Sequence, residues 1–136
     1  MAQPRVVLAD DVPMSLAAFA SVLRNSCDIV AMADDGCAAL AAIRQFHPDL
    51  AVLDLEMPGM NGIEITRTVI REQPNLGIII CSVNIDPWIV REAASAGARG
   101  YISKARISRD LAKVVSVVSA GGTFFSDLQP ATELPR

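Results

Sequence analysis

The sequence predicts an α/β fold in which helices cover both faces of one parallel, five-stranded sheet. Short apolar runs alternate along the chain with segments whose apolar residues recur at helical spacing. The apolar runs are continuous, which is typical of strands that are buried on both faces. Right-handed crossovers between such strands produce a doubly wound sheet with helices on its two sides.

Five runs are predicted strands because they are short, apolar and rich in β-branched residues. They are Val6–Ala9, Ile29–Met32, Leu50–Leu53, Gly77–Cys81 and Gly100–Ile102. Five helices are predicted between and after them. They are Pro13–Arg24, Gly36–Phe46, a helix opened by Asn61-Gly62 and closed near Gln73-Pro74, one from Asp86-Pro87 to Ala96, and Ile107–Ala120.

The ends of these helices carry their own signals. Pro13 suits a first helical turn, where a missing N–H costs nothing. His47-Pro48 ends the second helix, because the residue before proline disfavours the helical region. Asp86 is an expected N-cap with proline after it, and Gly97 is an expected C-terminal stop.

Composition indicates one cytoplasmic domain. The chain has 136 residues, 51% of them hydrophobic, and a net charge of −3, which disfavours direct nucleic-acid binding. There is no apolar run of about 18 residues to span a membrane, and the N-terminus lacks a signal-peptide layout. We expect residues 1–126 to form the domain and 127–136 a tail or the start of a linker. Cys27, Cys37 and Cys81 are expected to be reduced core thiols, and His47 a surface residue.

Polar residues collect at the carboxyl ends of the predicted strands, where open α/β sheets bind ligands. Asp10 and Asp11 follow the first strand, Asp54 the third, Ser82 the fourth and Lys104 the fifth. Three carboxylates suit Mg²⁺, which takes oxygen ligands. Without a metal, their mutual repulsion should raise the pKa of at least one of them.

This cluster suits phosphoryl transfer, in which catalysis is mainly positioning and electrostatics. A carboxylate can be the nucleophile and form an aspartyl phosphate. Lys104 would add a fixed positive charge, and the Ser82 hydroxyl one hydrogen bond. Each residue taken alone has a plainer interpretation, as a cap, a turn residue or a solvated lysine. Their order at successive strand ends favours the functional interpretation.

The chain resembles the receiver domain of two-component response regulators from about Arg5 to Ala120. The resemblance depends on four motifs: Asp10-Asp11, Asp54 with Met57-Pro58-Gly59-Met60-Asn61-Gly62, Ser82, and Gly97-Ala98-Arg99-Gly100-Tyr101-Ile102-Ser103-Lys104. It implies the flavodoxin-like strand order 2-1-3-4-5. It also implies a signalling switch rather than a conventional enzyme, active only in promoting its own phosphorylation and dephosphorylation.

The resemblance implies that Asp54 accepts a phosphoryl group from a phosphohistidine on a sensor histidine kinase. Asp10, Asp11, Asp54 and the backbone carbonyl of Glu56 would then hold Mg²⁺, and Lys104 would pair with the acyl phosphate.

The remaining implied roles belong to the conformational switch. Ser82 would hydrogen-bond the phosphoryl group and shift toward it, while Tyr101 moves between outward and inward rotamers. Glu56 and Asn84 are candidate modulators of hydrolysis, and we find mere exposure equally plausible for each.

Two positions depart from the family pattern. Many receivers have proline after the strand-five lysine, joined by a cis bond, but this chain has Ala105. A cis bond to a residue other than proline costs about 2.5–4 kcal/mol, so we expect either a trans bond or a strained one. Ser82 replaces the commoner threonine and keeps the hydroxyl.

The segment Gly121-Gly122-Thr123-Phe124-Phe125-Ser126 is similar to receivers of the NarL/FixJ (LuxR-type) class, which carry a helix-turn-helix DNA-binding domain after a linker. The resemblance therefore implies transcriptional output. The alternatives are a stand-alone receiver that acts through protein contacts, a metal-dependent phosphohydrolase and a degenerate binding module. A hydrolase would show a second Asp where Glu56 stands, and it would need a cap domain.

Two helices carry candidate positions for partner contacts. Core packing is expected for one of Trp88 and Ile89, and an exposed aromatic residue there would serve a partner. Val117 widens the apolar stripe of the last helix, so that helix is a candidate surface for a homodimer or an output domain.

Overall fold

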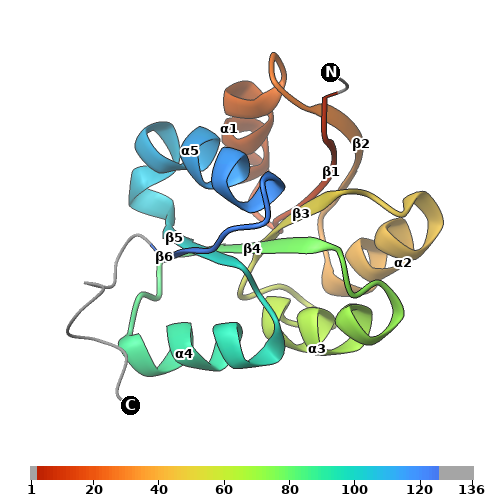
Figure 1. The fold of residues 1–136 in the computed structure, drawn as a ribbon, viewed down its shortest axis with the longest axis vertical. Coiled ribbons are helices and arrows are strands. Elements are labelled where there is room, and N and C mark those ends of the chain that lie inside the picture. The colour runs from red at the N-terminus through yellow and green to blue at the C-terminus, as the bar shows by residue number, and fades with distance from the viewer. Residues whose placement is uncertain (1–2, 126–136) are drawn as a thin grey trace.

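The computed structural model describes residues 3–125 and contains one six-stranded parallel sheet in the order β2-β1-β3-β4-β5-β6 (Figure 1). The strands are β1 (Arg5–Ala9), β2 (Asp28–Ala33), β3 (Leu50–Asp54), β4 (Gly77–Ser82), β5 (Gly100–Ser103) and β6 (Phe124–Phe125). The helices are α1 (Pro13–Leu23), α2 (Gly36–Phe46), α3 (Gly62–Glu72), α4 (Pro87–Ala96), the 3₁₀ helix η1 (Lys104–Arg106) and α5 (Ile107–Ser119). The predicted α/β class and the order of the first five strands are confirmed.

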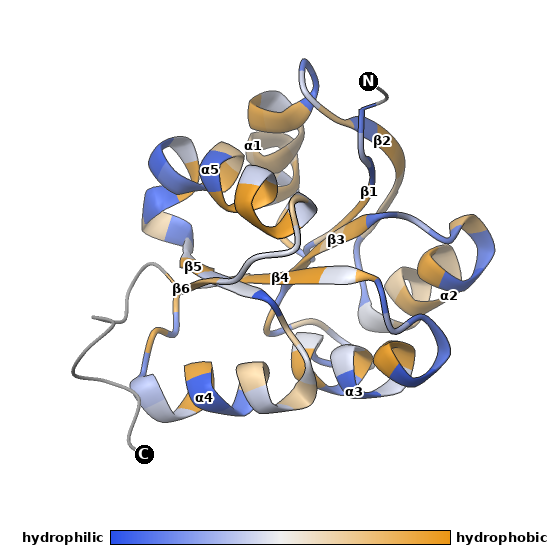
Figure 2. Ribbon diagram, in the orientation of Figure 1, coloured by the Kyte–Doolittle hydropathy of each residue, from blue (hydrophilic) through white to orange (hydrophobic). Residues whose placement is uncertain are grey.

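The sheet separates two hydrophobic cores. Helices α1 and α5 cover one face, and α2, α3 and α4 cover the other (Figure 1). The central strands are almost entirely hydrophobic (Figure 2), and every residue of β3 and β4 is buried. Burial on both faces explains the continuous apolar runs in the sequence.

The helix ends follow local sequence. The Asp35 side chain caps α2 by accepting from the Ala38 N–H at 2.7 Å. Asn61 and Glu64 form a reciprocal capping box at the start of α3. Gly97 ends α4 with φ of 118°, a conformation that L-residues with a Cβ rarely adopt.

Helix α4 is anchored more lightly than its neighbours. It buries only Val90 and Ala93, whereas α3 buries five residues and α5 buries six. Trp88 at its start is 57% exposed, and Ile89 is partly buried against the core on that face. The prediction that one residue of this pair packs into the core is therefore confirmed.

Two elements were not predicted. Strand β6 pairs with β5 through Gly100 opposite Phe124 and Tyr101 opposite Phe125, so the sheet has six strands instead of five. A two-residue strand is too short to show a periodic pattern, which explains why it was missed. The turn η1 directly follows β5. The predicted tail at 127–136 and the last residue of the predicted domain, 126, lie outside the described residues.

The expectation of three core thiols was wrong for Cys37, which is exposed near the start of α2, while Cys27 and Cys81 are buried. The error arose because an alanine-rich helix gives little indication of which side faces the core. His47 is exposed as expected, and it ends α2 in the left-handed region with φ of 44°. Between residues 3 and 125, no helix has both the length and the apolar character needed to cross a bilayer.

Candidate functional site

The parallel sheet brings the predicted site residues to one edge. Strand β1 lies between β2 and β3, with Ala9 opposite Leu53, so Asp10 and Asp54 emerge side by side. Strand β4 flanks β3 on the other side and ends in Ser82. Strand β5 follows and delivers Lys104. Residues that are far apart in the sequence thus lie close together at the carboxyl ends of neighbouring strands.

The three carboxylates converge at this edge. Asp10, Asp11 and Asp54 each offer one oxygen, and these oxygens lie within 4.8 Å of one another. Asp10 and Asp54 are buried, whereas Asp11 is exposed. Asp10 Oδ1 also accepts a hydrogen bond from the Val12 N–H at 2.8 Å.

Lys104 supplies the positive charge between two of these carboxylates. Its Nζ lies 2.7 Å from Asp10 Oδ2 and 3.3 Å from Asp54 Oδ1. Apart from this ion pair, the buried Asp10 Oδ2 has no hydrogen-bond partner in the described part of the chain. One ammonium group therefore serves two carboxylates, and Asp10 retains capacity to bind a further cation.

The surroundings of the Asp54 carboxyl group disfavour its ionised form. Burial and then the nearby charge of Asp10 raise the pKa of Asp54 from 3.8 to about 6, although Lys104 acts in the opposite direction. The expectation of a raised carboxylate pKa is confirmed, but burial contributes more than the predicted repulsion. For Lys104, burial alone would lower the pKa, yet its hydrogen bond to Asp10 and the charge of Asp54 give a net increase.

Three carboxylates with oxygen ligands, their net negative charge and an Asp10 Oδ2 paired only with Lys104 make this cluster a fit for a hard divalent cation such as Mg²⁺. Glu56, expected to contribute its backbone carbonyl, follows β3 by two residues, and its side chain is exposed.

Ser82, Asn84 and Tyr101 form a second group beside the carboxylates. Ser82 Oγ accepts a hydrogen bond from the Asn84 N–H at 2.9 Å, and the Tyr101 hydroxyl donates to the Asn84 carbonyl. Ser82 and Tyr101 are each 1% exposed. Burial raises the pKa of Tyr101 to about 12, with a hydrogen bond to Ser82 opposing the rise, so the hydroxyl keeps its proton at neutral pH. Residue 84 therefore links the end of β4 to the tyrosine of β5.

Residues 6–116 match the family described as the response regulator receiver domain. The chain belongs to this family. A receiver is a signalling domain and not a conventional enzyme.

The relatives of this receiver are transcription regulators. The DNA-binding transcriptional activator EvgA of Escherichia coli strain K12 is 29% identical over 120 residues, which cover 88% of this chain and 59% of EvgA. The probable transcriptional regulatory protein NarL of Mycobacterium tuberculosis is 35% identical over 113 residues, covering 82% of this chain and 52% of that protein. The chain thus spans about half the length of the curated relatives it matches.

Solved structures agree with this assignment. The receiver domain of M. tuberculosis NarL superposes with a TM-score of 0.85 at 32% identity, covering 89% of this chain and 99% of that one. A LuxR-family response regulator from Aurantimonas gives a TM-score of 0.86 at 29% identity, covering 93% of this chain and 91% of that one. The receiver is therefore of the NarL/LuxR class.

Close packing shapes the loop that follows the receiver's Asp54. Gly59 has φ of 89°, a conformation that glycine adopts readily and that suits a tight turn. Gly62 begins α3 without a positive φ, but a Cβ there would lie 2.7 Å from the Asp54 carbonyl oxygen, so the loop can approach β3 this closely only with a glycine at this position. Sequence reasoning missed Gly36, where a Cβ would lie 2.1 Å from the Met60 carbonyl oxygen.

The bond between Lys104 and Ala105 is trans, because there is no cis peptide bond in the described chain. Ala105 instead donates its N–H to Ser103 Oγ at 3.1 Å, within the turn η1. Of the two expectations for this position, a trans bond or a strained cis bond, the structure shows the trans bond.

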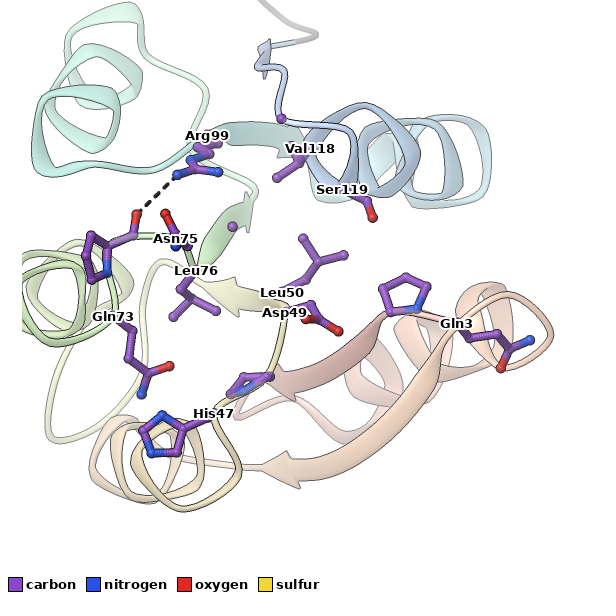
Figure 3. Close-up of a pocket in the computed structure, with 15 residues that line it drawn as sticks. Gln3, His47, Asp49, Leu50, Gln73, Asn75, Leu76, Arg99, Val118 and Ser119 are labelled. Carbon is purple, nitrogen blue, oxygen red and sulfur yellow. Dashed lines mark hydrogen bonds between the residues drawn. The ribbon is translucent and has the colours of Figure 1, made fainter. Parts of the chain in front are cut away.

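A cavity of about 540 Å³ (Figure 3) is lined by residues at the amino ends of the strands, including Leu50 of β3 and Gly77 of β4, whereas the carboxylate cluster lies at the carboxyl ends. Its prominent polar groups are engaged by the protein's own backbone. Arg99 donates to the Pro74 carbonyl, Gln73 donates to the Ile43 carbonyl, and Asp49 accepts from a backbone N–H. These bonds give the side chains structural roles at the loops, and none of the residues that line the cavity belongs to the acidic site.

Proposed function

We propose that this receiver accepts a phosphoryl group on Asp54 from a phosphohistidine of a sensor histidine kinase and switches conformation in response. The observation that carries the proposal is the placement of Asp54. Its carboxylate is buried at the end of a core strand, shares a cluster with Asp10, and has Lys104 Nζ at 3.3 Å. An isolated buried carboxylate would be costly without such partners.

Asp10, Asp11 and Asp54, together with the backbone carbonyl of Glu56, would hold Mg²⁺. When bound, the ion would neutralise negative charge on the carboxylates and on the incoming phosphoryl oxygens. Lys104 would remain as the second positive group, able to pair with a phosphoryl oxygen. The repulsion among the carboxylates explains why such a site needs a cation.

The transfer is balanced in atoms and charge. An oxygen of the ionised Asp54 carboxylate attacks phosphorus, and the bond between phosphorus and the imidazole nitrogen breaks as the bonding pair returns to that nitrogen. The product is an aspartyl phosphate. Water attack on the same phosphorus would reverse the modification, and Glu56 and Asn84 are the proposed modulators of this slow autodephosphorylation. Asn84 Oδ1 accepts from the Asp86 N–H at 3.1 Å, which holds its loop in place.

The proposed switch uses bonds that already exist. Ser82 Oγ accepts a hydrogen bond from the Asn84 N–H, so a shift of Ser82 toward a phosphoryl group would move the oxygen that holds this part of the loop. The Asn84 carbonyl holds the Tyr101 hydroxyl. Movement of Ser82 would therefore favour one Tyr101 rotamer over another, which makes the loop from β4 to α4 the two-state element.

For the output, we propose transcription control through a downstream DNA-binding domain. The names of EvgA and NarL support this, because both describe transcription regulators. Each of these proteins is also roughly twice as long as the segment that matches this chain. The receiver itself would not bind nucleic acid or membrane. A cytoplasmic location and a homodimer remain proposals. A stand-alone receiver acting by protein contacts is the alternative, and a metal-dependent phosphohydrolase ranks below both.

Incubation with Mg²⁺ and acetyl phosphate, followed by intact-mass measurement, tests the chemistry. The wild-type chain should gain one phosphoryl group, and Asp54→Asn should gain none. Asp28→Asn, which changes an exposed carboxylate at the other end of β2, is the matched control and should be modified normally. Release of phosphate without an adduct would favour the hydrolase, and neither adduct nor release would reject the phosphoacceptor function.

A further inference from the structure

Strand β6 lies next to the strand that carries Tyr101, a residue of the proposed switch. It forms the edge of the sheet next to β5 (Figure 1), and its register sets Phe125 directly opposite Tyr101. Partner residues in neighbouring parallel strands project to the same face. Phe125 accordingly packs against the core beneath α2, α3 and α4, to which Tyr101 belongs.

The neighbouring residue faces the other way. Phe124 packs against the core beneath α1 and α5, and Lys113 Nζ lies 5.6 Å from the centroid of its ring. Its backbone N–H donates to the Arg99 carbonyl at 2.9 Å, which anchors the start of the strand. The two phenylalanines are both partly buried, so they form a matched pair on opposite faces of one short strand.

We propose that β6 is a readout element whose docking through Phe125 is coupled to the buried position of Tyr101. The inference rests on the proposed function, because it assigns to β6 the regulation of the same site. While Tyr101 is buried with its hydroxyl on Asn84, its ring and Phe125 form adjoining parts of one core. An outward Tyr101 would remove that neighbour and weaken the docking of Phe125.

This coupling gives the phosphoacceptor site a short path to the chain that continues beyond residue 125. The steps are Ser82 to Asn84, Asn84 to Tyr101, and Tyr101 to Phe125, each a contact or strand register described above. Coupling between sites is reciprocal, so a change at Phe125 must alter the affinity at the phosphoryl site by the same factor.

The test measures the affinity of the 1–136 chain for beryllofluoride, a phosphoryl mimic, in the presence of Mg²⁺. The only tryptophan, Trp88 at the start of α4, provides a fluorescence signal, and calorimetry provides a second measurement. Phe125→Ala should weaken binding by at least about fivefold, the lower end of typical coupling. Phe124→Ala should change it by less than about twofold, because its ring faces α5.

A double-mutant cycle isolates the coupling. In a Tyr101→Ala background, Phe125→Ala should have little further effect. If Tyr101→Ala does not fold, Tyr101→Phe keeps the ring and removes the bond to Asn84, and it should also reduce the effect of Phe125→Ala. Equal losses for the two phenylalanine variants, or additive losses with the tyrosine variants, would overturn the coupling. If the wild-type chain binds no beryllofluoride and forms no acetyl-phosphate adduct, the proposed function itself fails, which is a distinguishable result.

Discussion

The raised pKa of Asp54 predicts that this proposed phosphoacceptor destabilises its own domain. Replacing Asp54 with asparagine removes a charge from a buried position while nearly preserving the size of the side chain. Lys104 keeps its ion pair with Asp10 at 2.7 Å, so the substitution leaves no lysine unpaired. We therefore expect Asp54→Asn to be more stable than the wild-type chain at neutral pH when no metal is present.

The size of the effect follows from the pKa. A carboxyl group whose pKa rises from 3.8 to about 6 on folding costs about 3 kcal/mol at pH 7 when it ionises. Between these two values the folded state binds more protons than the unfolded state, so the stability of the wild-type chain falls as pH rises through this window. The same relation gives roughly half that cost at pH 5 and less than about 1 kcal/mol at pH 4.

Urea unfolding in EDTA at pH 4, 5 and 7 would measure this difference. The stability gap between Asp54→Asn and wild type should widen with pH, and Asp28→Asn should stay within about 0.5 kcal/mol of wild type. Adding millimolar Mg²⁺ at pH 7 should stabilise the wild-type chain and narrow the gap. A gap at pH 7 no larger than that of the control, or a gap independent of pH, would refute the reasoning.

Two further predictions concern packing and thiol chemistry. Gly36→Ala should lower the free energy of unfolding by more than about 2 kcal/mol, because its Cβ would lie 2.1 Å from the Met60 carbonyl oxygen; a urea midpoint equal to that of wild type would contradict this. A thiol reagent at pH 8 should label the folded chain once, at exposed Cys37, because Cys27 and Cys81 are buried and burial raises the pKa of both thiols. All three should react in urea, and rapid labelling of three thiols under native conditions would refute the burial assignment.

Most of the fold was predictable because strands that are buried on both faces of a sheet appear in the sequence as continuous apolar runs. The continuous run at Gly77–Cys81, for example, became a strand with every residue buried. Strand β6 was not predictable, since two aromatic residues have no period and their pairing depends on where β5 lies. Cys37 was assigned to the wrong side because alanine fits a core and a surface equally well.

The candidate site was predicted as a set of residues, but its energetics were not. Strand ends indicated that Asp10, Asp54 and Lys104 would meet, and the structure brings them together. Sequence alone led us to expect charge repulsion as the main cause of a raised carboxylate pKa, yet burial proves larger at Asp54. Depth of burial depends on how the loops pack around the strand ends, which the order of residues along the sequence does not reveal.

The light anchoring of α4 has an evolutionary consequence. Only Val90 and Ala93 of this helix are buried, so most of its side chains contribute little to the stability of the fold. Substitutions on its outer side can accumulate without eroding the sheet or the acidic site. Duplicated copies of such a gene could therefore diverge in the proteins they recognise while they retain the same chemistry, which would let one fold serve many separate signalling channels in a cell.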